Sequence, residues 1–157
     1  MSEPDAIRTI LLGVDGSPES DRAATFAATL ARHLGADVVA VHAVGLLDVW
    51  PEHPHGEKDH DPHGPVEVLL EGPWTAPLRR DDIPLRLVVR DGPPSIVLLD
   101  VADEVDADLI VLGSRGAGRG DLDSLGSTSA KIAQRSALPV VVVPAARSAA
   151  EVPPSFT

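Results

Sequence analysis

The chain contains no cysteine among its 157 residues, so it can form no disulfide bridge and can offer no thiolate to a metal ion. Positive charge is also in short supply: 13 lysine and arginine residues stand against 24 aspartate and glutamate residues, and the formal net charge is -11. Such an acidic protein is poorly suited to bind a nucleic-acid backbone or an anionic membrane surface. Any bound phosphate group also needs hydrogen-bond donors close to it, because the overall field repels it.

Long hydrophobic runs are missing as well. No stretch is apolar over the length needed to span a bilayer, and no N-terminal segment combines a basic flank with the apolar core of a signal peptide. We therefore expect a cytoplasmic protein that contacts neither membrane nor nucleic acid. The sequence also lacks an internal repeat, and with 43% hydrophobic residues its length suits one α/β domain with a full core.

What the chain does contain is a regular alternation of short apolar runs and helical patterns. The apolar runs predict five buried strands, at residues 7–14, 37–44, 85–89, 109–112 and 139–144. Helical patterns or helix-start signals occupy residues 17–34, 66–70, 74–80, 91–105 and 127–136. The apolar face of the fourth helix is expected to comprise Ile96, Leu99, Val101, Ala102 and Val105. Residues 1–144 are thus predicted to form one domain, and the small residues and prolines of 145–157 a disordered tail.

Strands that alternate with helices predict an α/β fold, here a doubly wound, five-stranded parallel sheet with helices on both faces. The expected strand order is 3-2-1-4-5, which places the first and fourth strands side by side. In such sheets a ligand sits beyond the carboxyl ends of the strands, at the point where the order reverses. The loops that leave the first and fourth strands are therefore expected to form one crevice.

The loop after the fourth strand carries the most informative pattern in the chain, G-x2-G-x9-G-S, made by Gly113, Gly116, Gly126 and Ser127. Glycines allow positive φ angles and bring backbone N–H groups close to a ligand. The hydroxyls of Ser127 and Thr128, with the free N–H groups of a helix start, supply further donors for an anion. This segment is predicted to cradle phosphate groups, although a plain strand-to-helix turn could use the same glycines.

The loop after the first strand, Asp15-Gly16-Ser17, opens on the same crevice. Ser17 is a suitable N-cap for the following helix, and Pro18 is a suitable first helical residue. Asp15 can then serve as part of the cap or as a ligand contact, and the two roles are compatible.

Several motifs in a fixed order resemble the universal stress protein family, in its single-domain, ATP-binding form. The likeness spans residues 7–144 and rests on Val14-Asp-Gly-Ser17, Val41-His-Ala43, Asp91-Gly-Pro93, the glycine pattern and Leu138-Pro-Val-Val-Val-Val143. It implies an adenine-nucleotide α-hydrolase-like fold that binds ATP with Mg²⁺. It further implies a nucleotide-dependent regulatory protein of the stress response, with slow ATP hydrolysis at most and an unknown protein partner.

The resemblance also implies specific contacts. Asp15 and the backbone at Ala43 would contact the adenosine, while the glycine pattern would hold the ribose and the phosphates. The full predicted nucleotide site is Asp15, Gly16, Ser17, Ala43, Gly113, Ser114, Arg115, Gly116, Gly126, Ser127 and Thr128. No residue is predicted to act as a catalyst or as a metal ligand.

Four features leave alternatives open. Ala43 is smaller than the residue usual at this point in the family, which would loosen the adenine wall. Asp121 and Asp123 lie within the phosphate loop and either face water, hold Mg²⁺ or weaken ATP binding, of which we favour the first. His42 is expected to be a hydrogen-bonded core histidine. Residues 51–65 are rich in histidine and acidic side chains, and we expect a solvated loop rather than a zinc or nickel site.

Two other functions compete with ATP-dependent regulation. An adenine-nucleotide α-hydrolase-type enzyme is disfavoured, because such enzymes carry Ser-Gly-Gly-x-Asp-Ser after the first strand and this chain does not. No general base is evident, and the P-loop motif Gly-x4-Gly-Lys-Ser/Thr is absent. A ligand-free structural dimer would use the glycines only to shape the turn.

The apolar edge strand 139–144 predicts a homodimer, since an unpaired apolar edge needs a cover and no later segment is apolar enough.

Overall fold

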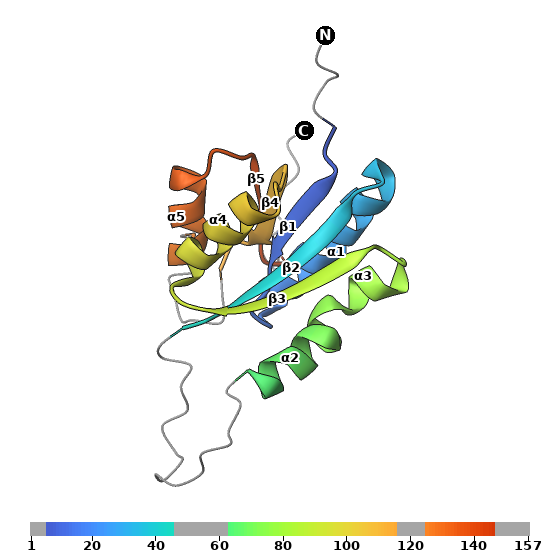
Figure 1. Cartoon of the computed structure of the whole chain (residues 1–157), viewed down its shortest axis with the longest axis horizontal. Helices are drawn as coiled ribbons and strands as arrows, with labels where there is room; N and C mark the ends of the chain where they lie inside the picture. Colours follow the sequence, from blue (N-terminus) through green and yellow to red (C-terminus); the bar gives the residue numbers. More distant parts are fainter. Residues whose placement is uncertain (1–5, 46–62, 116–124, 147–157) are drawn as a thin grey trace, which may run out of the picture.

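The computed structural model describes residues 6–45, 63–115 and 125–146, and it is built around one five-stranded sheet (Figure 1). The strands are β1 (Thr9–Gly13), β2 (Asp37–Val44), β3 (Leu85–Asp91), β4 (Leu109–Gly113) and β5 (Val140–Val143). Neighbouring strands are parallel, and the order β3-β2-β1-β4-β5 confirms the predicted topology. In register, Ile10 of β1 stands opposite Val38 of β2 and Leu109 of β4.

Helices cover both faces of the sheet. They are α1 (Pro18–Leu34), α2 (Gly64–Glu71), the 3-10 helix η1 (Pro73–Thr75), α3 (Ala76–Arg80), α4 (Pro94–Glu104) and α5 (Ser127–Arg135). Helices α1, α2 and α3 lie on one face, and α4 and α5 lie on the other (Figure 1). This arrangement follows from parallel pairing, because each crossover must carry the chain back over one face of the sheet before the next strand begins.

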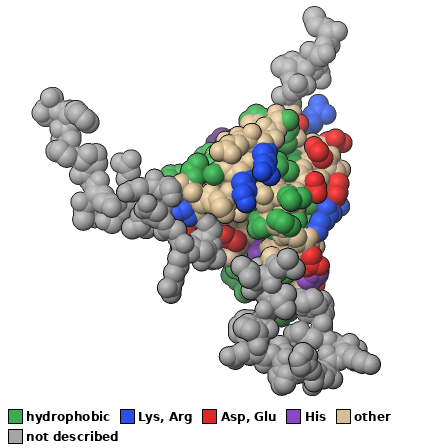
Figure 2. All heavy atoms as spheres, turned by 90° about the vertical axis from the view of Figure 1, so that its left-hand side faces the viewer, with side chains coloured by type: hydrophobic (Ala, Val, Ile, Leu, Met, Phe, Trp, Pro, Cys, Tyr) green, Lys and Arg blue, Asp and Glu red, His purple; other side chains and the backbone are tan. Residues whose placement is uncertain are grey.

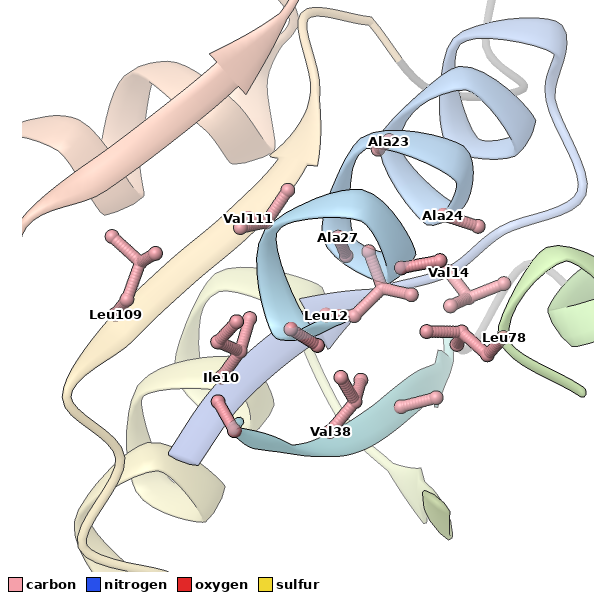
Figure 3. Close-up of a cluster of buried hydrophobic side chains, with 14 of the residues drawn as sticks. Ile10, Leu12, Val14, Ala23, Ala24, Ala27, Val38, Leu78, Leu109 and Val111 are labelled. Carbon is pink, nitrogen blue, oxygen red and sulfur yellow. The ribbon is translucent and has the colours of Figure 1, made fainter. Parts of the chain in front are cut away.

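Two hydrophobic clusters fill the space between the sheet and its helices. Successive side chains of β1 point to opposite faces, so that Leu12 packs toward α1 while Leu11 packs toward α4. Figure 3 shows the α1 cluster, in which the strand side chains meet small residues of α1 and one leucine of α3. These helical residues are Ala23, Ala24, Ala27 and Leu78. The small side chains of the three alanines let α1 lie close to the sheet.

The predicted limits of α1 are confirmed by its caps. The Ser17 hydroxyl accepts a hydrogen bond from the N–H of Ser20 at 3.1 Å, which is the side-chain N-cap expected of serine. At the other end, Gly35 adopts the left-handed conformation and its N–H donates to the carbonyl of Ala31. The direction in which α1 leaves the β1 loop is therefore fixed at both ends of the helix.

The predicted apolar face of α4 is wrong at Ile96, whose side chain is 49% exposed. Val97 and Leu98 are buried instead, together with Val101 and Ala102. Because residues 96–99 are all apolar, the sequence allows more than one side of the helix to be buried. The rotation of α4 on the sheet decides which side that is. The predicted helix at 74–80 is likewise divided into η1 and α3.

Among the described residues, no helix combines the length and the apolar character needed to cross a membrane. The outer face formed by α4 and α5 carries hydrophobic, basic and acidic side chains side by side (Figure 2). Residues 46–62 and 147–157 lie outside the described part of the chain. Helix α2 begins at Gly64, so the predicted loop 51–65 is wrong at its last two residues, which are helical. The predictions of a solvated loop before residue 63 and of a disordered tail stay predictions.

Candidate functional site

The loop between β1 and α1 is held by short hydrogen bonds. Asp15 Oδ1 accepts the N–H of Ser17 at 2.9 Å, and the N–H of Asp15 donates to Ser20 Oγ at 3.1 Å. This Asx-type turn fixes the orientation of the Asp15 carboxylate at the end of β1. Asp15 thus supports Ser17, the N-cap of α1, while the predicted ligand contact of Asp15 stays a prediction.

Gly16 is required by the packing of Trp74. Its φ angle is +78°, and a Cβ atom added here would lie 2.6 Å from three atoms of the Trp74 indole. The indole also packs on the ring of His42, with 5.1 Å between ring centroids. His42 Nδ1 donates to the carbonyl oxygen of Val14 at 2.7 Å, so this half-buried histidine has the internal partner that was expected. Trp74 thereby ties η1 to the carboxyl ends of β1 and β2.

An open cavity of about 340 Å³ lies beside Trp74, on the side of α1. It is lined by Gly16, Ser17, Pro18, Ser20, Asp21, Pro73 and Trp74. The lining includes Gly16 and Ser17 of the predicted nucleotide site, and none of the described residues 113–115 that follow β4.

The structure brings the two ends of the glycine pattern together beyond β4. The carbonyl oxygen of Ser114 accepts the N–H of Gly126 at 2.7 Å and the hydroxyl of Ser129 at 2.7 Å. On its other side, the Ser114 N–H donates to the carbonyl of Val143 in β5 at 2.8 Å. Ser114 therefore fastens the start of α5 to the carboxyl edge of the sheet.

Gly113 and Gly126 both lie where a side chain would crowd its neighbours. A Cβ atom on Gly113 would be 2.8 Å from the Cβ of Glu19, in the first turn of α1. A Cβ atom on Gly126 would be 3.2 Å from the Cα of Arg115. The protein's own packing is enough to favour glycine at both positions. These glycines alone therefore do not distinguish a ligand site from a tightly packed turn.

Helix α5 begins at this junction. Its N-cap is Gly126, which has no side chain that could cap the first turn. Ser127 is exposed and Thr128 is half-buried. Because the first N–H groups of a helix have no intrahelical acceptor, they and the two hydroxyls can be directed at an anion.

A cation and a carboxylate stand beside this helix start. Arg115 Nη2 lies 3.8 Å from Glu19 Oε1, and the two side chains are 19% and 15% exposed. Arg115 belongs to the predicted site, but Glu19 does not. In the sequence, a glutamate in the first turn of a helix signals only a favourable interaction with the helix dipole. Its position against β4 is visible only once α1 is packed on the sheet.

Ala43 lies at the carboxyl end of β2, where its side chain is buried in the cluster beneath α4. Its backbone, in register with Arg90 of β3, is the part placed near the strand ends. The predicted contact between the Ala43 backbone and a nucleotide stays a prediction.

Within the parts of the chain that the structure describes, no three histidine or acidic side chains are grouped so that they could hold a metal ion. His63, at the end of the histidine-rich segment, has its Nε2 atom 2.9 Å from Asp91 Oδ1. Gly116, Asp121 and Asp123 lie outside the described residues, as do His53, His55 and His60. The expectations for these six positions stay untested.

Comparison with known proteins places this architecture among related chains. Universal stress protein Sll1654 of Synechocystis sp. is 37% identical over 144 residues, which cover 87% of this chain and 85% of the relative. A universal stress protein of Mycolicibacterium smegmatis is 33% identical over 140 residues, covering 88% of this chain but only 46% of the relative. The chain thus spans about half the length of that mycobacterial protein.

Two solved structures share the fold and contain a nucleotide. A universal stress protein in complex with cAMP matches with a TM-score of 0.69 at 26% identity, over 90% of this chain and 100% of the other. The Archaeoglobus fulgidus universal stress protein in complex with dAMP matches with a TM-score of 0.61 at 26% identity, over 88% and 99%.

The strand order and the two loops at the switch point define a doubly wound α/β domain of the adenine-nucleotide α-hydrolase-like type. The model of the universal stress protein family matches residues 6–144. The chain therefore belongs to the universal stress protein family.

Proposed function

We propose that this chain binds ATP, together with Mg²⁺, in the crevice between the β1 and β4 loops. Occupancy of this site would regulate a partner protein in the cytoplasmic stress response, with slow hydrolysis at most. The observation that carries the proposal is the set of hydrogen bonds made by Ser114. They hold the N-terminus of α5 at the carboxyl ends of the strands, one strand away from the Asp15 loop.

The phosphates would be held by donors from the β4 side of the crevice. The first N–H groups of α5 and the hydroxyls of Ser127 and Thr128 form one group of donors, and the Arg115 guanidinium adds a positive charge. Gly113, Ser114, Gly116 and Gly126 would bring backbone close to the ligand. A bound Mg²⁺ would offset the repulsion between a triphosphate and a protein of formal net charge -11.

The adenosine would lie toward β1 and β2. Asp15, already oriented by its turn, would contact it together with the backbone of Gly16, Ser17 and Ala43. Two related structures support an adenine nucleotide, since they are complexes with cAMP and with dAMP. We infer ATP from the complete glycine pattern, whose donors suit a chain of several phosphates.

A ligand-free structural role is the second candidate, and one observation favours it. Glu19 and Arg115 approach Gly113 and Gly126 so closely that glycine is favoured there without any ligand. In that case the chain would bind no nucleotide, and its function would rest on assembly alone.

Calorimetric titration with ATP, ADP and AMP, each with and without Mg²⁺, separates the two candidates. Thr128→Val keeps the shape of the side chain but removes a hydroxyl that would meet a charged phosphate. We expect it to weaken ATP binding by about tenfold, which corresponds to about 1.4 kcal/mol. Gly126→Val should abolish binding, because its side chain would press on the Arg115 backbone.

Thr25→Val is the matched control. Thr25 lies on the exposed side of α1, and its hydroxyl bonds only to the backbone of the same helix, at Asp21 O. This variant should bind ATP as the unmodified protein does. If the unmodified protein binds none of the three nucleotides, the ligand-free candidate is correct and the proposed function is wrong.

A further inference from the structure

Glu19 is packed against the end of β4, although a glutamate that only interacts with the helix dipole could remain in solvent. It is the second residue of α1, and its side chain is only 15% exposed. Its Cβ packs against Gly113, at the last position of β4, where any Cβ atom would lie 2.8 Å away. The carboxylate is therefore held at the mouth of the loop that would bind phosphates.

The partner of Glu19 is Arg115, a cation of the predicted phosphate site. Arg115 Nη2 stands 3.8 Å from Glu19 Oε1, a distance that is too long for a hydrogen bond but short enough for a Coulombic interaction. The Arg115 backbone meanwhile lies against Gly126, at the start of α5. Arg115 thus connects a protein carboxylate, through its side chain, with the start of the helix that would receive an anion, through its backbone.

The helix dipole alone does not account for this arrangement. Asp21 occupies the same first turn of α1 and interacts with the same dipole, yet it is exposed and borders the cavity beside Trp74. Of the two acidic residues in this turn, only Glu19 is packed on β4 and paired with Arg115. The pair therefore has a local role at the phosphate loop.

We infer that Glu19 is a specificity-determining residue that limits the negative charge the site accepts. This inference rests on the proposed function. Glu19 offsets the positive charge of Arg115, so that the pair contributes little net attraction to a phosphate. Each phosphate added to the ligand then adds to the repulsion from the Glu19 carboxylate. The site consequently discriminates against free ATP and admits ATP as its Mg²⁺ complex.

The test compares how affinity changes with the number of phosphates in two charge-matched variants. Adenosine, AMP, ADP and ATP are titrated by calorimetry into the unmodified protein, Glu19→Gln and Asp21→Asn, once with EDTA and once with Mg²⁺. Glu19→Gln should raise the ratio of ATP to AMP affinity by about tenfold in EDTA and by clearly less in Mg²⁺. Asp21→Asn loses the same charge from the same turn and should leave that ratio unchanged. Thermal unfolding without ligand verifies that each variant is folded, and Glu19→Ala replaces Glu19→Gln if the latter is not.

The outcomes separate the inference from the function on which it rests. If the unmodified protein binds nucleotides but the ratio is the same in Glu19→Gln, Glu19 does not select by charge and the inference fails. An equal rise in both variants points to a general effect of net charge and also overturns it. If no nucleotide binds to the unmodified protein, the proposed function itself is wrong, and the inference falls with it.

Discussion

At the scale of single residues, Gly16 and Gly35 adopt similar positive φ angles, 78° and 65°, in very different surroundings. Trp74 covers Gly16, whereas no atom comes within 4 Å of the place where a Cβ on Gly35 would lie. The two positions therefore separate the cost of backbone strain from the cost of crowding a neighbour. Trp74 is the residue that makes the difference.

We predict that Gly16→Ala lowers the free energy of unfolding by about 2–4 kcal/mol, since backbone strain and displacement of the indole add together. Gly35→Ala should lower it by about 1–2 kcal/mol, because strain acts alone. Urea unfolding followed by circular dichroism measures both values. Equal losses in the two variants would mean that Trp74 does not rest on Gly16 in solution.

At the scale of elements, the end of β3 is joined to the end of α4 by an exposed ion pair. The Arg90 guanidinium donates to both oxygens of Glu104, at 2.7 and 2.9 Å. These hydrogen bonds hold the pKa of the Glu104 carboxyl below its ordinary value of 4.5. Glu104 is the last residue of α4, where the helix dipole disfavours a negative charge, so Arg90 compensates for an otherwise unfavourable position.

This pair makes a pH-dependent contribution whose sign follows from the lowered pKa. A carboxyl with a lower pKa in the folded state stabilises the protein above its unfolded pKa, and that stabilisation is lost as the pH falls through the folded value. The melting temperature of Glu104→Gln should therefore lie slightly below that of the unmodified protein near neutral pH. The difference should shrink as the pH falls below about 4.5.

The effect should be small, because the pair is exposed and screened by solvent. Melting curves recorded at a series of pH values measure it. Asp103→Asn provides the control, since Asp103 is an exposed acid in the same helix. If the difference for Glu104→Gln is independent of pH, or equals that of Asp103→Asn at every pH, the ion pair contributes nothing in solution.

At the scale of the whole molecule, β5 is an edge strand that pairs on one side with β4. Val140, Val141 and Val142 are only half-buried, although they are the first three residues of an apolar strand. An edge of this kind favours pairing with another chain. We therefore propose that two copies join through β5 about a twofold axis, as the sequence predicts.

Val142→Lys should convert the dimer to a monomer, because a charged side chain at the shared edge would be buried without a partner. Light scattering at micromolar concentration should give about twice 16.4 kDa for the unmodified protein and about 16.4 kDa for the variant. Val68→Lys is the control, since Val68 is 69% exposed on α2, far along the sequence from the β5 edge. A mass near 16.4 kDa for the unmodified protein would rule out the dimer at that concentration.

The sequence alone determined the architecture of the sheet and the location of its loops. Apolar runs and caps such as Ser17 located the five strands, and the doubly wound arrangement expected of alternating strands and helices predicted the observed order. The same reasoning placed the Asp15 loop and the glycine pattern at the carboxyl ends of neighbouring strands. These features are local in the chain, or follow from topology, so no knowledge of side-chain packing was needed.

Only the tertiary structure decided which side chains meet across elements. Glu19 stands beside Arg115, and Trp74 on Gly16, because α1 and η1 pack at particular angles against the strand ends. The burial of Val97 and Leu98 in place of Ile96 was decided in the same way. Contacts between residues far apart in sequence depend on helix rotation and on the volume left between layers. Neither the rotation of a helix nor this volume can be predicted from a short segment of the sequence.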